Sequence, residues 1–106
     1  MSDHVLVLTT LPEQAIAMQI AEALVEEGLA ACVNVLPAMT SVYRWQGQRQ
    51  VDTEHQLLIK TRAARFSELE SFLRKHHPYE LPEIIALPIR MGSADYLAWI
   101  DENTHS

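Results

Sequence analysis

The sequence predicts an α+β sandwich in which two helices cover one face of a sheet. Strand-like runs and helical periodicity alternate in the order β-α-β-β-α-β, and one more helix follows. The runs that enter the first two helices, Leu6 to Thr10 and Leu58 to Thr61, echo each other. The central strands of a split βαβ fold run directly into helices in this way. We therefore expect a ferredoxin-like βαββαβ sandwich with an extra C-terminal helix.

The first strand and helix are predicted from composition and spacing. Val5 to Leu8 is a short run of valine and leucine, typical of a strand buried on both faces. Thr10 and Glu13 have the spacing of a capping box around Pro12, which predicts that the helix begins there. Gly28 predicts its end. Apolar residues recur between them at helical spacing: Ile16, Ile20 and Leu24.

The middle of the chain predicts a long β-hairpin. A strand from Ala31 to Val35 is interrupted at Pro37, which indicates a bulge or an edge position, and resumes from Thr40 to Trp45. Gln46 to Gln48 is the turn, and Val51 to Lys60 forms the returning strand.

The second half repeats the pattern. Ala64 to His76 is predicted to be a helix with phenylalanine and leucine on one side, and Ile84 to Ile89 a strand. Ser93 is predicted to cap the final short helix.

Composition limits the classes of function. The 106 residues suit a single domain, 1–106, and 48% of them are hydrophobic. A net charge of −6 without any basic run argues against binding of nucleic acid or of an anionic membrane. No apolar run is long enough to span a bilayer, and we expect a cytoplasmic protein without a signal peptide. The single cysteine excludes an intramolecular disulfide and multi-thiolate zinc sites.

The segment from Lys75 to Glu83 concentrates the chemistry of the chain. Two adjacent imidazoles, from His76 and His77, two carboxylates and two prolines fall within it. The prolines make the segment stiff, and imidazole with carboxylate is a ligand set for Cu(II) or another divalent cation. The alternative is that the histidines cap the end of the second helix, since adjacent helical side chains diverge.

Other polar residues have a functional and a structural reading. Cys32 is expected to be a small buried residue rather than a ligand. Tyr43 and Trp45 are expected to pack at an interface, with stacking against a planar ligand as the alternative. Glu54 and His55 are expected on a solvated face, with metal capture as the alternative.

Lys60 lies near the end of a predicted central strand, where burial without a partner would be costly. We expect Glu83 to be that partner. Together with Tyr79, these residues would line a cleft between subunits and bind a small molecule there.

A partner is predicted because the second face of the sheet needs a cover. Only one set of the alternating strand residues can face the helices. Either a symmetric copy covers the other set, with the hairpin as the arm that reaches it, or the final helix folds over that face. We expect an oligomer.

Four motifs in this order resemble the CutA divalent-cation tolerance proteins, from about His4 to Trp99. They are Val7–Thr10, Gly28–Asn34, Ser41–Gly47 and His77–Ile84. The resemblance implies a homotrimer similar to the PII signalling proteins, linked to copper tolerance and responses to other divalent metals, with no established catalytic activity. Some relatives bind Cu(II) through two adjacent histidines, matching His76 and His77, and a cysteine at the position of Thr9.

Two classes of function follow. The first is a metal-responsive homotrimer that binds Cu(II) or another divalent cation, weakly because threonine replaces the thiolate ligand. The second is a PII-like scaffold that binds a small molecule or an unknown protein in intersubunit clefts, with indirect metal effects. An enzyme is not expected, since the sequence has no nucleophile-base pair, phosphate-binding glycine loop or Glu-x-x-His motif.

Overall fold

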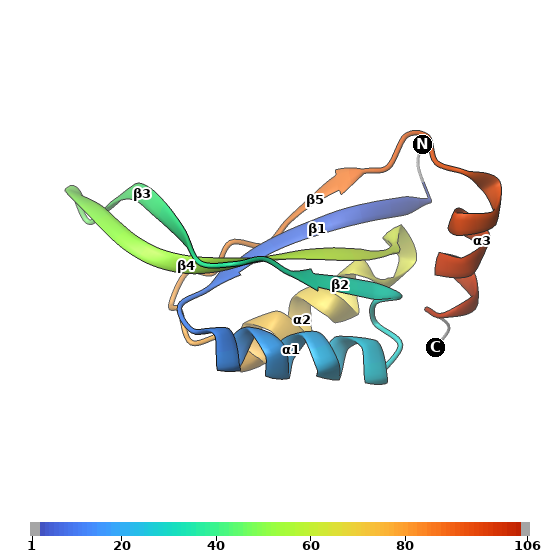
Figure 1. Cartoon of the computed structure of the whole chain (residues 1–106), viewed down its shortest axis with the longest axis horizontal. Coiled ribbons are helices and arrows are strands. Elements are labelled where there is room, and N and C mark those ends of the chain that lie inside the picture. Colours follow the sequence, from blue (N-terminus) through green and yellow to red (C-terminus); the bar gives the residue numbers. More distant parts are fainter. Residues whose placement is uncertain (1–2, 105–106) are drawn as a thin grey trace.

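A computed structural model describes residues 3–104 as one sheet with two helices on one face and a third helix at its end (Figure 1). The elements in chain order are β1 (His4–Leu11), α1 (Gln14–Glu26), β2 (Cys32–Val35), β3 (Met39–Trp45), β4 (Gln48–Arg62), a 3-10 turn (Ala63–Arg65), α2 (Phe66–His76), β5 (Ile85–Pro88) and α3 (Ala94–Glu102). This order confirms the predicted ferredoxin-like arrangement with its additional C-terminal helix.

Strands β1 and β4 form the centre of the sheet. The strand order is β2-β4-β1-β5, and β3 pairs with the distal part of β4. All pairs are antiparallel, and Val7 of β1 lies opposite Ile59 of β4. The two central strands are those that lead into α1 and α2, as the echo between the two halves of the sequence indicated.

The core lies between the sheet and the two helices. The sheet contributes fully buried residues of alternating position, among them Val7, Leu57 and Ile59, and the helices contribute Leu24 and Leu69. Each buried leucine or isoleucine side chain contributes about 1.5 to 3 kcal/mol relative to an exposed one. The apolar core of the domain is thus the layer between this face of the sheet and the two helices.

The start of α1 differs from the predicted capping box. Thr10 is buried within β1, and the helix begins only at Gln14, after Glu13, which makes no side-chain capping hydrogen bond. Pairing of β1 with β4 continues to Leu11, so the strand takes up the residue that the motif assigned to the cap. The predicted end is confirmed, because Gly28 adopts a φ of 69°.

The hairpin of β3 and β4 extends away from the body of the molecule (Figure 1). Its two-residue turn joins Trp45 to Gln48. Gln46 and Gly47 both have positive φ, 51° and 78°, which matches a turn whose twist suits a hairpin.

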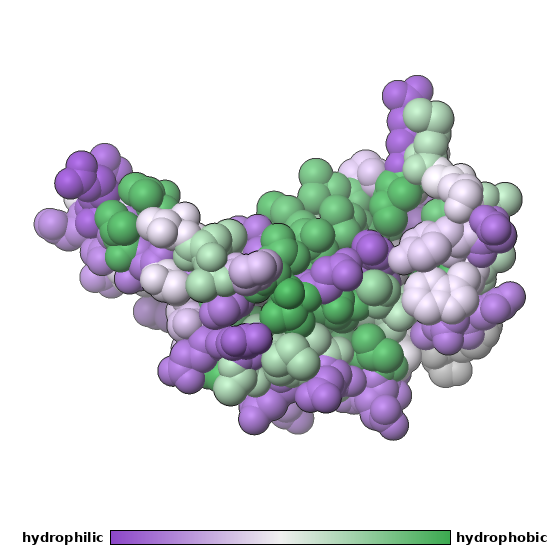
Figure 2. All heavy atoms as spheres, viewed as in Figure 1, coloured by the Kyte–Doolittle hydropathy of each residue, from purple (hydrophilic) through white to green (hydrophobic). Residues whose placement is uncertain are grey.

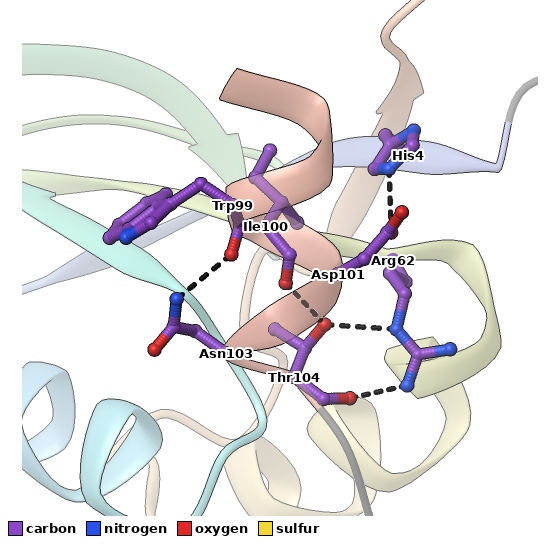
Figure 3. A network of polar contacts seen from close by, with 7 residues as sticks. All are labelled: His4, Arg62, Trp99, Ile100, Asp101, Asn103 and Thr104. Carbon is purple, nitrogen blue, oxygen red and sulfur yellow. Dashed lines mark hydrogen bonds and ion pairs between the residues drawn. The ribbon is translucent and has the colours of Figure 1, made fainter. Parts of the chain in front are cut away.

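Helix α3 covers the end of the sheet and leaves much of its second face open. Arg62 of β4 donates to Thr104 Oγ1 at 2.9 Å and to its carbonyl, and His4 contacts Asp101 at 2.8 Å (Figure 3). On this face, large side chains remain exposed on β5 and on the hairpin: Ile85, Leu87 and Tyr43. Figure 2 shows apolar residues gathered in the hollow between the hairpin and the α3 end. The final helix is therefore not the cover of this face.

Within residues 3–104, none of the helices combines the length and the apolar character needed to cross a membrane.

Candidate functional site

The loop after α2 is fixed to the end of β1 by His77. Its Nε2 lies 2.8 Å from the carbonyl oxygen of Thr10, and the backbone N–H of Tyr79 donates to its Nδ1 at 3.1 Å. Because Nδ1 accepts, the proton of the neutral ring is on Nε2, which donates to Thr10. Both ring nitrogens are thus engaged, and the histidine ends α2 while holding the start of the loop.

Burial lowers the pKa of His77 below its ordinary value of 6.5. The Thr10 carbonyl and the charge of Glu54 act in the opposite direction but do not overcome burial. The pKa shift agrees with the hydrogen bonds, because a charged imidazolium would carry a proton on the nitrogen that accepts from Tyr79.

A second tie joins the loop to β4. The hydroxyl of Tyr79 donates to Oε2 of Glu54 at 2.8 Å, and Glu54 is only 7% exposed. Burial, followed by this hydrogen bond, raises the pKa of Tyr79 far above its ordinary value, so the hydroxyl remains a donor. The expectation that Glu54 lies on a solvated face is wrong, because the Tyr79 side chain reaches it. His55 makes its own contact, with Nδ1 3.2 Å from the carbonyl of Leu36.

A third tie comes from Gln56. Its Nε2 donates to Oε2 of Glu83 at 3.0 Å and to the carbonyl of Thr9 at 3.3 Å. The side chain therefore bridges the end of β1 and the end of the loop. Together with His77 and Tyr79, it holds residues 77–83 against the sheet at three points.

Within one chain Lys60 lies away from Glu83 and the two side chains do not pair, so pairing between subunits stays a prediction. The register places Lys60 opposite Leu6, whereas Gln56, the partner of Glu83, lies opposite Thr10. The ammonium of Lys60 lies 5.8 Å from the centre of the Tyr96 ring, on α3. Lys60 lies four positions beyond Gln56 on β4, roughly 13 Å along the extended chain.

The loop and the hairpin enclose a cleft of about 760 Å³. Of the three residues predicted to bind a small molecule, Tyr79 and Glu83 line it and Lys60 does not. The hairpin contributes Tyr43 and Trp45, and the hydroxyl of Tyr43 donates to Asp52, which raises the pKa of Tyr43. This volume lies in the range of small-molecule sites. One chain supplies these walls, and the contribution of a second subunit stays a prediction.

The two predicted metal ligands have different surroundings. His76 is exposed and its ring lies 4.3 Å from that of Phe72, between ring centres. His77 is buried with both nitrogens occupied. In the part of the chain that the structure describes, no three histidine, cysteine, aspartate or glutamate side chains gather as a metal-binding group. This arrangement does not fit an ion chelated by both rings of one chain, and metal ligation stays a prediction.

Neither Thr9 nor Cys32 completes such a group. Thr9 is fully buried on the helix-covered side of β1, and its hydroxyl has no hydrogen-bond partner among residues 3–104. Cys32 is half-buried opposite Lys60, so the expectation of a small buried core residue holds only in part. Strand β2 lies at an edge of the sheet, which leaves this side chain partly accessible.

Sequence reasoning missed Glu54 and Gln56 as parts of the site. Both follow Asp52 at alternating positions of one strand, so they share a face. Alternation alone could have grouped them. The contact with Tyr79 and Glu83, 25 and 27 residues further along the chain, required the tertiary structure.

The fold and site define a ferredoxin-like α+β protein with a polar cleft between its hairpin and the loop after its second helix. The chain belongs to the CutA1 divalent ion tolerance protein family, whose model matches residues 5–103. It is 52% identical to the divalent-cation tolerance protein CutA of Thermus thermophilus over 98 residues, 92% of this chain and 95% of that protein.

Solved structures show the same fold. The Cut A1 protein of Thermus thermophilus superposes with a TM-score of 0.94 at 50% identity, covering 96% of this chain and 99% of that one. CutA1 from a psychrotrophic Shewanella species, described as a stable protein, gives a TM-score of 0.95 at 40% identity, covering 99% and 98%.

Proposed function

We propose that this protein acts in divalent-cation tolerance as a cytoplasmic homotrimer that binds copper or another divalent ion and has no catalytic role. The observation that carries the proposal is family membership over residues 5–103, together with close relatives named for divalent-cation tolerance. The exposed His76 is the accessible imidazole of the predicted metal segment. Recruitment of His77 requires its ring to leave Thr10 and Tyr79.

The open face of the sheet supports assembly. Ile85 and Leu87 on β5 are 51% and 45% exposed, and Tyr43 on the hairpin is 42% exposed. Exposed apolar residues in such number mark an interaction surface. Sedimentation equilibrium is expected to give three times the mass of one chain, and Leu87→Glu is expected to shift the equilibrium toward monomer. A wild-type monomer at micromolar concentration would contradict the trimer.

Calorimetric titration with Cu(II) tests the metal role. We expect weak binding that is lost in a His76→Ala, His77→Ala double variant. A matched variant, His55→Ala, removes a histidine outside this segment and is expected to keep the affinity. Equal affinity in the wild type and the double variant would remove direct binding at this segment.

A second candidate function is a PII-like scaffold in which the cleft binds a small molecule and metal effects are indirect. The cleft of about 760 Å³ with a deeply buried carboxylate supports it. A thermal-shift screen of organic cations, organic anions, nucleotides and metals tests this role, because a ligand of the native state raises the melting temperature by mass action. A response to metals alone would count against it.

A further inference from the structure

The cleft between the hairpin and the 77–83 loop carries more negative than positive charge. Carboxylates of Glu54, Glu80 and Glu83 line it, against the one guanidinium of Arg44. Nη1 of Arg44 donates to the Gly47 carbonyl at 3.3 Å. Such a balance in a partly enclosed site favours a positively charged occupant.

Glu54 is the anchor in this cleft. Glutamate is rarely buried this deeply unless it is paired. The Tyr79 hydroxyl occupies Oε2, whereas Oε1 makes no hydrogen bond within residues 3–104. The fully enclosed side-chain atoms without a partner in that range are Thr9 Oγ1 and Arg65 Nε. Oε1 of Glu54 is not among these atoms, so it is not fully enclosed and can accept from a donor in the cleft that Glu54 lines.

The walls suit the rest of such a ligand. Tyr43, Trp45 and Tyr79 bring three aromatic rings to the cleft. Aromatic faces attract ammonium and guanidinium groups, and flat apolar groups stack against them. Tyr79 is positioned by two contacts, its backbone N–H to His77 and its hydroxyl to Glu54.

We propose that the cleft binds an organic cation, a primary amine or guanidine joined to a flat or apolar group, whose nitrogen donates to Oε1 of Glu54. The proposal deepens the small-molecule role given above as the second candidate function and rests on it. It also distinguishes this cleft from one that selects nucleotides or other organic anions, since a phosphate would face three carboxylates. The three cleft carboxylates do not gather into a group that could hold a metal ion, and no other such group occurs in the described residues, so a bare metal ion is the poorer occupant.

Two probes with the same ring and opposite charge separate these possibilities. Tryptamine carries an ammonium and indole-3-acetate a carboxylate on the same indole. The chain has two tryptophans, Trp45 in the cleft and Trp99 on α3, so the indole N–H signals of nitrogen-labelled protein give one reporter and one internal reference. Tryptamine is expected to shift the Trp45 signal saturably and leave Trp99 unchanged. Indole-3-acetate at equal concentration is expected to shift neither.

A charge-removing variant tests the anchor. Glu54→Gln is expected to weaken tryptamine binding by roughly tenfold or more, the loss typical of one charge-assisted hydrogen bond. Glu26→Gln, at an exposed position of α1 outside the cleft, is the matched control and should bind as the wild type does. Should Glu54→Gln fail to fold, Glu83→Gln, at an exposed position, is expected to weaken binding by a smaller factor.

The outcomes separate this inference from the role on which it rests. If indole-3-acetate shifts the Trp45 signal and tryptamine does not, the proposal of a cationic ligand is overturned, while the proposal that the cleft binds a small molecule stands. Equal tryptamine affinity in the wild type and Glu54→Gln overturns the anchor. If neither tryptamine nor agmatine, an aliphatic guanidine, shifts Trp45 of the folded protein, the inference falls, whereas the small-molecule role falls only if the thermal-shift screen responds to metals alone.

Discussion

The two ends of strand β4 hold other segments of the chain with polar contacts, but only one end leaves groups free. At the α3 end, Arg62 donates to Thr104, whose hydroxyl in turn donates to the carbonyl of Ile100 at 2.8 Å (Figure 3). At the hairpin end, Gln56 and Glu54 hold the 77–83 loop, and Glu54 keeps one oxygen without a hydrogen bond in the described chain. The first network is closed on itself, whereas the second lines a cleft.

This difference teaches how to separate structural from functional polar groups in one small domain. A buried network whose donors and acceptors are satisfied stabilises a particular packing. A largely buried carboxylate with one oxygen free of protein hydrogen bonds can accept from a donor of a ligand. Changes at the α3 end should therefore alter stability, and changes at the hairpin end should alter binding more than stability.

The largest stability effect is expected at the closed end. Arg62→Ala removes hydrogen bonds from a charged donor to Thr104 and should lower the free energy of unfolding by about 2 to 3 kcal/mol. Urea denaturation at fixed protein concentration measures it, and tryptamine affinity should not change. Arg90→Ala, at an exposed position, is the control and should stay within about 0.5 kcal/mol of the wild type. A loss in Arg62→Ala no greater than in the control would contradict the closed network.

The adjacent histidines provide the next comparison. His77→Ala removes two hydrogen bonds and should cost about 2 kcal/mol, whereas His76→Ala should cost no more than about 0.5 kcal/mol. The Cu(II) affinity should follow the opposite order, with the larger loss in His76→Ala, because the exposed ring of His76 is the accessible ligand. Calorimetry and denaturation on the same two variants test both orders, and a larger stability loss in His76→Ala would refute the assignment.

The lowered pKa of His77 predicts how stability changes with pH. Below pH 6.5, the ordinary pKa of histidine, the unfolded chain protonates residue 77, whereas the native state keeps His77 neutral. The contribution of neutral His77 to the free energy of unfolding is therefore complete above pH 6.5, and it is lost as the pH falls below that value toward the folded pKa. Denaturation midpoints between about pH 7.5 and about pH 5 measure this. His77→Gln should flatten the profile relative to His76→Gln, and parallel profiles would contradict the prediction.

The sequence predicted the fold well because local signals agreed with it. Alternation, glycine and proline placed the elements, and the echo between the two halves identified the central strands. The capping box at Thr10 failed because strand pairing extends to Leu11 and competes for the same residue. Residue propensities and short capping motifs do not take pairing with a distant strand into account.

The site was harder to predict because its contacts depend on register. His77, Tyr79 and Glu83 were recognised as one segment, but their partners lie on β1 and β4. A shift of two residues along β4 would have changed which side chain meets the loop. Charge alone suggested Lys60 as the partner of Glu83, and charge does not encode position along a strand.

The smallest expected effect tests that position directly. A double-mutant cycle of Lys60→Met and Glu83→Gln should give a coupling energy below about 0.5 kcal/mol, because the two side chains meet different partners. The matched cycle of Glu54→Gln and Tyr79→Phe should give about 1 kcal/mol, since these groups share a hydrogen bond at 2.8 Å. Urea denaturation of the single and double variants supplies both numbers. A larger coupling for Lys60 with Glu83 would mean that the 77–83 loop reaches further along the sheet than its three hydrogen-bonded contacts allow. The Lys60 ammonium would then lie in the cleft, where it would compete with a cationic ligand.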